Sequence, residues 1–280
     1  MARTWTPVFY REDFPQYFGG ATGGTLILDD WAQIDPTETI VFPKSVFQIQ
    51  KILQVGVQTL LQVTTREYPY SDTYYIDARF VKIIETKTPP QERTIKLPNR
   101  IGIVRKMKSQ VGKPYVWWGN ANNGVPLLTR YYRSQDPLTS ELRQKWTLDG
   151  FDCSGLLYWA TDGYTPRNTS KLITFGTGLE IVWKTPEEIA SILRPLDLIV
   201  WKGHNMIVID GGNIIESTVN FTGSGNYSTP NGVRIRPARE ALEEIMTLKN
   251  KVPLNNYDDT YGKNQFVIRR WFPWQNVGNV

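Results

Sequence analysis

No helical periodicity occurs before residue 100, so the first part of the chain is expected to fold from short strands. Residues 1–86 contain runs rich in β-branched and aromatic side chains, namely TLILDD, TIVFP, VFQIQKIL, QTLLQVTT and TYYIDARFVKII. Turn-forming sequences such as YFGGATGG and YPYSD separate these runs. The pattern predicts a small β-barrel.

A polar segment follows, and the periodicity then becomes helical. ETKTPPQERTIKLPN contains three prolines and predicts a linker over residues 87–99. RIGIVRKMKSQVG predicts a helix that stops at Gly112. Its expected apolar face consists of Ile101, Val104, Met107 and Val111. TPEEIASIL predicts a later helix with Pro186 in its first turn.

The remainder of the chain turns back to strands. LDLIVW, HNMIVI, NIIEST, GVRIRP and FVIRRWF have strand character, and one helix, AREALEEIMTLKN, interrupts them. Helices first and antiparallel strands second predict an α+β domain over residues 100–280.

Charge narrows the class of partner. The net charge is +5, with 10 Lys+Arg against 11 Asp+Glu in residues 1–98 and 22 against 16 in the rest. This basic balance favours an anionic substrate or surface. No dense Lys/Arg run and no zinc-type spacing occur, so nucleic acid is not expected as a partner.

The chain has one cysteine and one histidine. A single cysteine forbids an internal disulfide, and this pair cannot form a Cys/His zinc site, so we expect no metal and no cofactor. The N-terminus MARTWTPVFYRED lacks the apolar stretch of a secretory signal, and no apolar run is long enough to span a membrane.

The cysteine is predicted to begin a helix, DCSGLLYWATDG. Asp152 is a favoured N-cap residue and Gly163 a natural stop. In the first turn, backbone N–H groups and the helix dipole would lower the pKa of the Cys153 thiol. The same N–H groups could hold an oxyanion. The alternative is a buried structural cysteine.

The histidine opens an alternating strand, HNMIVID, followed by a hairpin. If DGG is a three-residue turn, Ile209 pairs with Asn213, and Glu216 lies diagonal to His204 on one face. Its carboxylate could then accept the imidazole Nδ1–H and leave Nε2 to face the thiol. A two-residue turn would instead place Ser217 and Asn213 on that face.

The segment FDCSGLLYW resembles the Asp-Cys-Ser-Gly signature of NlpC-type cysteine peptidases, the γ-D-glutamyl peptide endopeptidases of bacterial cell walls. Three further segments match in order. VGKPYVWWGN resembles the Gly-x-Pro-Tyr-x-Trp-Gly segment, YTPRNTS the Pro-Arg-x-Ser segment, and LRPLDLIVWKGHNMIVIDGGNIIES the Pro-Gly-Asp-Leu segment with its histidine hairpin. Together they span roughly residues 100–220. The resemblance implies a papain-like catalytic domain with helices packed on an antiparallel sheet.

Such enzymes often carry an N-terminal SH3-like module, and YYIDARFVKI resembles the last strands of one. The resemblance therefore implies an SH3-like β-barrel for residues 1–86, which would bind wall or narrow one end of the cleft.

Carried over residue by residue, the resemblance implies Cys153 as nucleophile, His204 as base and Glu216 as the third polar residue. Tyr115 would contact the reaction centre or the oxyanion. The residues that would line the pocket are Trp117, Asp152 and Ser154.

The sequence departs from the family pattern in three places. An insertion at about residues 120–150 stands where the family has a short connection, and it could cover or reshape the substrate groove. Leu196 replaces the usual glycine before Asp197, and Asn205 replaces a small apolar residue after the histidine. These changes affect substrate choice more than reaction type.

The prediction is a cysteine endopeptidase that hydrolyses peptidoglycan stem peptides or muropeptides, at γ-D-Glu–diaminopimelate or γ-D-Glu–Lys bonds, through a Cys-His-Glu triad. Two alternatives stay open. One is a virion-associated or wall-binding structural protein that keeps the fold with little or no turnover, and the other is an amidase or acyltransferase. Without a signal, the expected location is the cytoplasm, where muropeptides are recycled, or a phage protein that reaches the wall by lysis or in the virion.

Overall fold

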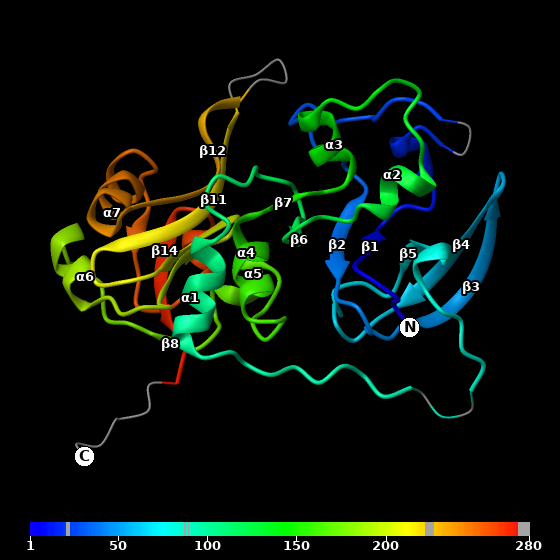
Figure 1. Cartoon of the computed structure of the whole chain (residues 1–280). Helices are drawn as coiled ribbons and strands as arrows, with labels where there is room; N and C mark the ends of the chain where they lie inside the picture. Colours follow the sequence, from blue (N-terminus) through cyan, green and yellow to red (C-terminus); the bar gives the residue numbers. More distant parts are fainter. Residues whose placement is uncertain (21–22, 87, 89, 222–226, 274–280) are drawn as a thin grey trace. The chain divides into compact units, whose positions relative to one another are not determined.

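The computed structural model describes residues 1–20, 23–86, 88, 90–221 and 227–273 (Figure 1). The chain divides into two compact units. Unit 1 consists of Met1–Ile95, Lys113–Gly155 and Thr218–Gly232, and unit 2 consists of Lys96–Gly112, Leu156–Ser217 and Val233–Val280.

Unit 1 contains a five-stranded antiparallel sheet of order β2-β1-β5-β4-β3. Its elements are β1 Thr6–Phe9, η1 Phe14–Phe18, β2 Thr37–Val41, β3 Gln48–Val55, β4 Gln58–Thr64, β5 Tyr74–Asp77 and η2 Ala78–Phe80. Four of the five runs predicted as strands contribute to this sheet. The prediction for TLILDD is wrong, because residues 25–30 form no strand and the side chain of Ile27 is 51% exposed.

The predicted SH3-like β-barrel is not confirmed. Among the described residues the sheet is open, with β2 and β3 at its edges. The outer edge of β2 is occupied by the buried amide of Asn120, which accepts the N–H of Ile40 at 3.0 Å and donates to its carbonyl at 2.7 Å. Ile40 lies opposite Pro7, whose nitrogen has no hydrogen to donate to Ile40. The N–H and the carbonyl of Ile40 therefore point away from β1. A side chain therefore ends the sheet on this side.

The predicted insertion at residues 120–150 is part of unit 1. It contains β6 Asn120–Ala121, α2 Leu127–Tyr131, α3 Ser140–Trp146 and β7 Gly150–Phe151, and β6 pairs with β7. Its buried side chains share one core with the sheet, and they are Ala121, Val125, Leu128, Tyr132, Trp146 and Leu148. The Tyr132 ring lies 5.3 Å from that of Phe18, and its hydroxyl donates to Asp77 at 2.6 Å. The insertion thus completes the core of the N-terminal sheet.

The predicted domain boundaries stay predictions. The two compact units do not follow them, because the segment from Lys113 to Gly155 groups with the N-terminal residues. Within the predicted linker, residues 90–99 form neither helix nor strand. Lys87 and Pro89 lie outside the described residues.

Helices and an antiparallel sheet combine in the rest of the chain, as the α+β prediction requires. The helices are α1 Arg100–Lys108, α4 Cys153–Ala160, α5 Thr169–Leu172, α6 Pro186–Ile192, α7 Ala238–Thr247 and the 3-10 turn η3 Asp259–Tyr261. The strands are β8 Thr177–Gly178, β9 Leu198–Trp201, β10 His204–Val208, β11 Asn213–Phe221, β12 Tyr227–Pro237, β13 Val252–Pro253 and β14 Gln265–Arg270. The sheet order is β12-β11-β10-β9-β14-β13, with β8 on β14 and only the β13–β14 pair parallel among the pairings described.

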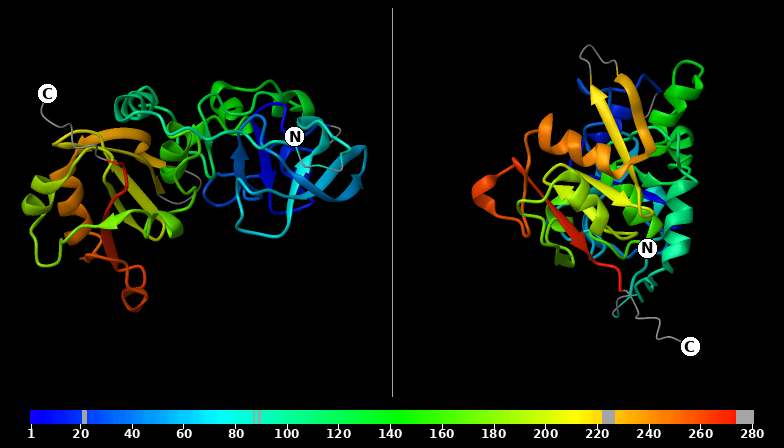
Figure 2. Two further views of the ribbon diagram at one scale, coloured as in Figure 1. Left: turned by 90° about the horizontal axis from the view of Figure 1, so that it is seen from below. Right: turned by 90° about the vertical axis from the view of Figure 1, so that its left-hand side faces the viewer.

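Helices α6 and α7 cover one face of this sheet (Figures 1 and 2). Alternate residues of the strands point to them, because successive side chains of a strand lie on opposite faces. From α6 and its C-cap, the buried cluster contains Ile189 and Leu193, and from α7 it contains Ala241, Leu242 and Ile245. The strands contribute Ile199, Trp201, Met206, Val208, Ile214, Phe266 and Ile268. Helix α6 starts as predicted, with Pro186 in its first turn and a Thr185–Glu188 capping box.

The predicted apolar face of α1 is wrong in part. Ile103 and Met107, four residues apart, are fully buried, whereas Ile101 is 64% exposed and Val111 lies beyond the helix. The helix ends at Lys108, one turn earlier than expected, so its buried stripe is set by the i, i+4 pair.

Candidate active site

The cysteine lies where the sequence predicts it, at the first residue of α4. The N–H of Gly155 donates to Asp152 Oδ1 at 2.6 Å, and the Ser154 hydroxyl donates to the same oxygen at 3.1 Å. Asp152 is therefore the N-cap, as predicted. Cys153 is 6% exposed, which makes it a buried residue at the start of a capped helix.

A chain of close backbone contacts fixes this helix start within unit 1. A Cβ on Gly155 would lie 2.1 Å from the carbonyl oxygen of Gly119, and one on Gly119 would lie 2.5 Å from that of Gly150. The Gly119 carbonyl also accepts the N–H of Asp152 at 3.0 Å. Neither position has room for a side chain, so both must be glycine. The segment before the insertion therefore lies directly against the segment after it.

Tyr115 lies beside β7, the strand that leads into the cysteine helix. It forms a parallel bridge with Phe151, and the N–H of Phe151 donates to the carbonyl of Pro114 at 3.2 Å. Tyr115 is 9% exposed, whereas the neighbouring Trp117 is 46% exposed and its N–H donates to the Gln33 side chain at 2.8 Å. Asp152 and Ser154 thus flank Cys153 along the chain, and Tyr115 pairs with Phe151, two residues before Cys153. The functional roles of these residues stay predictions.

The histidine hairpin has the predicted register. Ile207 pairs with Ile215, Val208 pairs with Ile214, and the N–H of Ile209 donates to the carbonyl of Asn213. The turn therefore has three residues, Asp210, Gly211 and Gly212, which confirms that prediction.

This register brings His204 and Glu216 together, with Nε2 of the imidazole 2.8 Å from a carboxylate oxygen. The predicted nitrogen is wrong, because Nε2 and not Nδ1 makes the contact. Since an ionised carboxylate only accepts hydrogen bonds, Nε2 carries the proton, and Nδ1 is the basic nitrogen of the neutral ring.

Two arginines of β12 bind the other oxygen of Glu216. Arg234 contacts it through Nε at 2.9 Å and Nη2 at 2.8 Å, and Arg236 Nε lies 2.8 Å away. Burial by itself raises the pKa of Glu216, but the hydrogen bond to His204 and the positive charges beside it outweigh burial and lower the pKa to about 2. The carboxylate, 1% exposed, is therefore ionised at neutral pH.

Sequence reasoning did not identify Arg234 and Arg236 as site residues. The signal was present in GVRIRP, because two arginines two positions apart on a strand lie on one face. Nothing in the sequence set the register of that strand against β11, however, because the residues between NIIEST and GVRIRP predict no turn of defined length.

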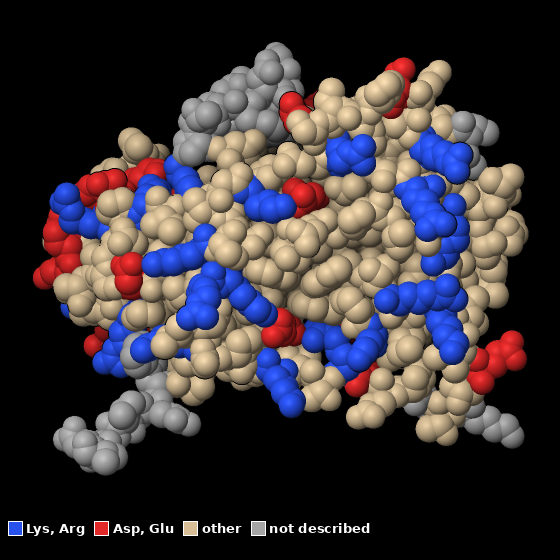
Figure 3. Space-filling view, viewed as in Figure 1, with Lys and Arg blue, Asp and Glu red and all other residues tan. Residues whose placement is uncertain are grey.

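The indole of Trp201 lies next to the imidazole, with ring centroids 5.1 Å apart. Lys249 and Lys251 lie over the same indole, 5.5 Å and 5.3 Å from its centroid. Burial lowers the pKa of Lys251. Figure 3 shows acidic side chains most densely over α6 and α7, which carry Glu187, Glu188 and Glu240.

Of the predicted triad, the structure brings His204 and Glu216 together in unit 2, whereas Cys153 belongs to unit 1. The pairing of Cys153 with His204 stays a prediction.

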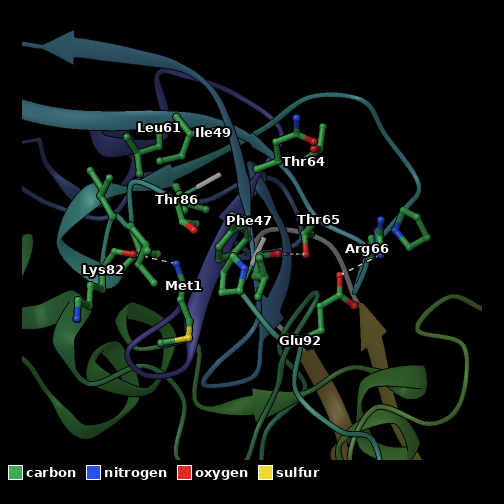
Figure 4. A pocket seen from close by; sticks show the side chains of 18 of the residues that line it. Met1, Phe47, Ile49, Leu61, Thr64, Thr65, Arg66, Lys82, Thr86 and Glu92 are labelled. Carbon is green, nitrogen blue, oxygen red and sulfur yellow. Dashed lines mark hydrogen bonds and ion pairs between the residues drawn. The ribbon is translucent and has the colours of Figure 1, made fainter. Parts of the chain in front are cut away.

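A separate groove of about 940 Å³ lies in unit 1, among β3, β4 and the segment after η2 (Figure 4). Apolar side chains including Phe47, Ile49 and Leu61 line it, and an Arg66–Glu92 ion pair of 3.6 Å lies at its side. None of the predicted site residues lines this groove.

Among the described residues, no group of three or more His, Cys, Asp or Glu side chains could hold an ion. In the same part of the chain, every helix is too short or too polar to cross a membrane.

No family model and no curated protein matches this sequence. Among solved structures, the chain is similar to the peptidoglycan hydrolase RipB from Mycobacterium tuberculosis, at 22% identity over 49% of this chain and 57% of that chain, with a TM-score of 0.31. It is similar to RipD from the same organism, a non-catalytic NlpC/p60 domain protein, at 19% identity over 49% of this chain and 86% of that chain, with a TM-score of 0.32. It is also similar to the P60 domain of an antigen from M. avium paratuberculosis, at 20% identity over 51% of this chain and 86% of that chain, with a TM-score of 0.32. This chain therefore spans 57% of the length of RipB, and its own activity, substrates and partners are proposals.

Proposed function

We propose that this protein is a cysteine peptidase that hydrolyses peptidoglycan stem peptides. Cys153 is the nucleophile, His204 the base, and Glu216 the acid that orients the base. The observation that carries the proposal is the 2.8 Å contact between His204 and the ionised Glu216, which fixes one imidazole tautomer. Additional support comes from the four ordered segments that resemble NlpC-type peptidases.

The reaction follows from these groups. Nδ1 of His204 takes the thiol proton, and the thiolate of Cys153 attacks the carbonyl carbon of the amide. The C–N bond breaks, the amine leaves with the proton from His204, and a thioester remains on the sulfur. Water then attacks the thioester, giving a carboxylate and the free thiol, so the net reaction is hydrolysis of one amide.

The remaining predicted residues act around this centre. Tyr115 contacts the oxyanion, while Asp152 holds the helix start and thereby places the first-turn N–H groups for the same oxyanion. Ser154 and Trp117 line the substrate pocket. The scissile bond that we propose joins γ-D-Glu to diaminopimelate or Lys.

The decisive experiment incubates the full chain with muropeptides of defined composition and identifies the products by mass. We expect cleavage at the γ-D-glutamyl bond by wild type and none by Cys153→Ser. Stem peptides that remain intact with wild type under all conditions would remove the peptidase proposal.

One observation favours a second function, a wall-binding protein without turnover. Cys153 is 6% exposed, and burial of this degree is typical of a structural cysteine.

Iodoacetamide labelling separates the two functions. For a peptidase, we expect rapid labelling of Cys153 at pH 6, because the helix start and His204 stabilise the thiolate, and His204→Ala should slow it at least tenfold. For a wall-binding protein, we expect slow labelling of both wild type and His204→Ala, with no effect of the substitution on the rate. Denatured protein gives the reference rate of an ordinary thiol.

A further inference from the structure

The surroundings of Glu216 contain more positive than negative charge. Arg236 joins Glu216 to Glu244, at 2.8 Å and 2.6 Å, and Lys249 lies 3.0 Å from Glu244. With Arg234, three cations therefore share two carboxylates in this network, and one positive charge is left over. A triad acid alone would instead leave the site with a negative charge next to the imidazole.

The surplus charge is located mainly on Arg234. Arg236 has a carboxylate on each side and a side chain that is 14% exposed. Arg234 has one carboxylate oxygen, which it shares with Arg236, and among the described residues it has no second acid. Its side chain is 27% exposed, so a ligand can reach it.

Arg234 is also close to the proposed base. Both groups contact the single carboxyl group of Glu216, one on each oxygen. The guanidinium and the imidazole nitrogen are therefore no more than about 8 Å apart, which is two hydrogen bonds and the width of a carboxyl group.

We propose that Arg234 is a specificity-determining residue that binds a free carboxylate on the substrate, next to the scissile amide. The inference rests on the proposed peptidase function and names its substrate class. A guanidinium binds a carboxylate more specifically than the ammonium group of a lysine does, since its planar N–H groups donate two parallel hydrogen bonds. In a γ-glutamyl amide, the α-carboxylate lies four bonds from the reacting carbonyl, at most about 5 Å away. Nδ1, the nitrogen that faces the scissile amide, is at most about 2 Å further from Arg234 than Nε2 is, which puts it within about 10 Å of the guanidinium. A carboxylate about 5 Å from the carbonyl, with a hydrogen-bond distance at each end, can span that separation.

The test uses two γ-glutamyl peptides that differ only at the α-position, a free carboxylate in one and a carboxamide in the other. For wild type, we expect kcat/KM to be about tenfold or more higher for the carboxylate peptide, mostly through KM. Arg234→Gln should bring this ratio close to one, and Arg234→Lys should retain part of it. Arg236→Gln is the matched control. It should lower the rates with both peptides and leave the ratio unchanged.

A binding experiment makes the result independent of turnover. Calorimetry on Cys153→Ala should show tighter binding of the carboxylate peptide by about tenfold, and the added Arg234→Gln substitution should remove that preference. An equal affinity for both peptides, or a preference that survives Arg234→Gln, overturns the role of Arg234. If wild type cleaves neither peptide, the peptidase function fails, while the binding ratio still decides the role of Arg234.

Discussion

At the scale of single residues, Glu216 determines the chemistry that the second unit can perform. One oxygen holds the imidazole of His204, and the other holds two guanidinium groups. The sequence predicted the partner but not the ring nitrogen, because residue spacing sets which side chains are neighbours and not how a ring is turned. It also missed the arginines, since no turn of defined length in the sequence relates their strand to β11.

The ionisation of Glu216 predicts a specific pH dependence of stability. The pKa is about 2 in the folded protein against 4.5 for the ordinary group, so the folded state binds fewer protons between these values. The stabilisation is complete above pH 4.5 and is lost as pH falls towards 2. We expect wild type to gain about 3 kcal/mol over Glu216→Gln between pH 2 and pH 7.

Urea unfolding of both proteins at pH 7, 4.5 and 3 measures this difference. Roughly half or more of it should be gone at pH 3. A difference that stays constant with pH would mean that Glu216 contributes through packing and not through its charge.

At the scale of elements, local rules predicted the start of α4 and the β10–β11 hairpin. An aspartate N-cap and a three-residue Asp-Gly-Gly turn need only adjacent residues, so both are readable from sequence. The barrel, which depends on distant partners, was not confirmed. Among the described residues the N-terminal sheet is open, and the edge of β2 is bound by Asn120, 80 residues after Ile40. No propensity encodes such a contact.

The glycine at the start of α4 gives a prediction of this kind. Gly155→Ala should destabilise the protein by about 2 kcal/mol, because the new methyl meets a backbone oxygen that cannot move aside, even though alanine favours a helix. Gly211→Ala in the hairpin turn is the matched control. It has open space around it and should change stability by about 0.5 kcal/mol or less. Equal unfolding midpoints for the two variants would show that the contact at Gly155 relaxes without cost.

At the scale of the whole molecule, the order of segments along the chain differs from their grouping in space. The sequence suggested a module over residues 1–86 followed by a separate domain with an insertion. In unit 1, however, the insertion supplies part of the core, because Phe14 and Phe18 pack on Tyr132. Composition and periodicity identified the strands but could not show that their hydrophobic face needed helices from elsewhere.

A fragment experiment tests this grouping. The peptide 1–95 alone should lack a cooperative unfolding transition and near-UV circular dichroism, because Val125, Leu128, Tyr132, Trp146 and Leu148 are missing from its core. Addition of the complementary fragment 96–280 should restore both signals. A peptide 1–95 that unfolds cooperatively by itself would show that the N-terminal sheet is an independent domain.

The hydrogen bonds of Asn120 also determine whether the N-terminal residues could be exchanged for another module. Asn120 binds the backbone of β2, and the carbonyl of Gly119 accepts the N–H of Asp152, the residue before the cysteine. The first strands and the start of α4 are therefore held by two adjacent residues. Replacement of residues 1–95 by an unrelated module would remove the partner of Asn120 and loosen the backbone that leads to Cys153. Exchange of modules suits parts that are joined only by a linker. Here, any replacement of residues 1–95 has to restore the bonds that Asn120 makes to β2.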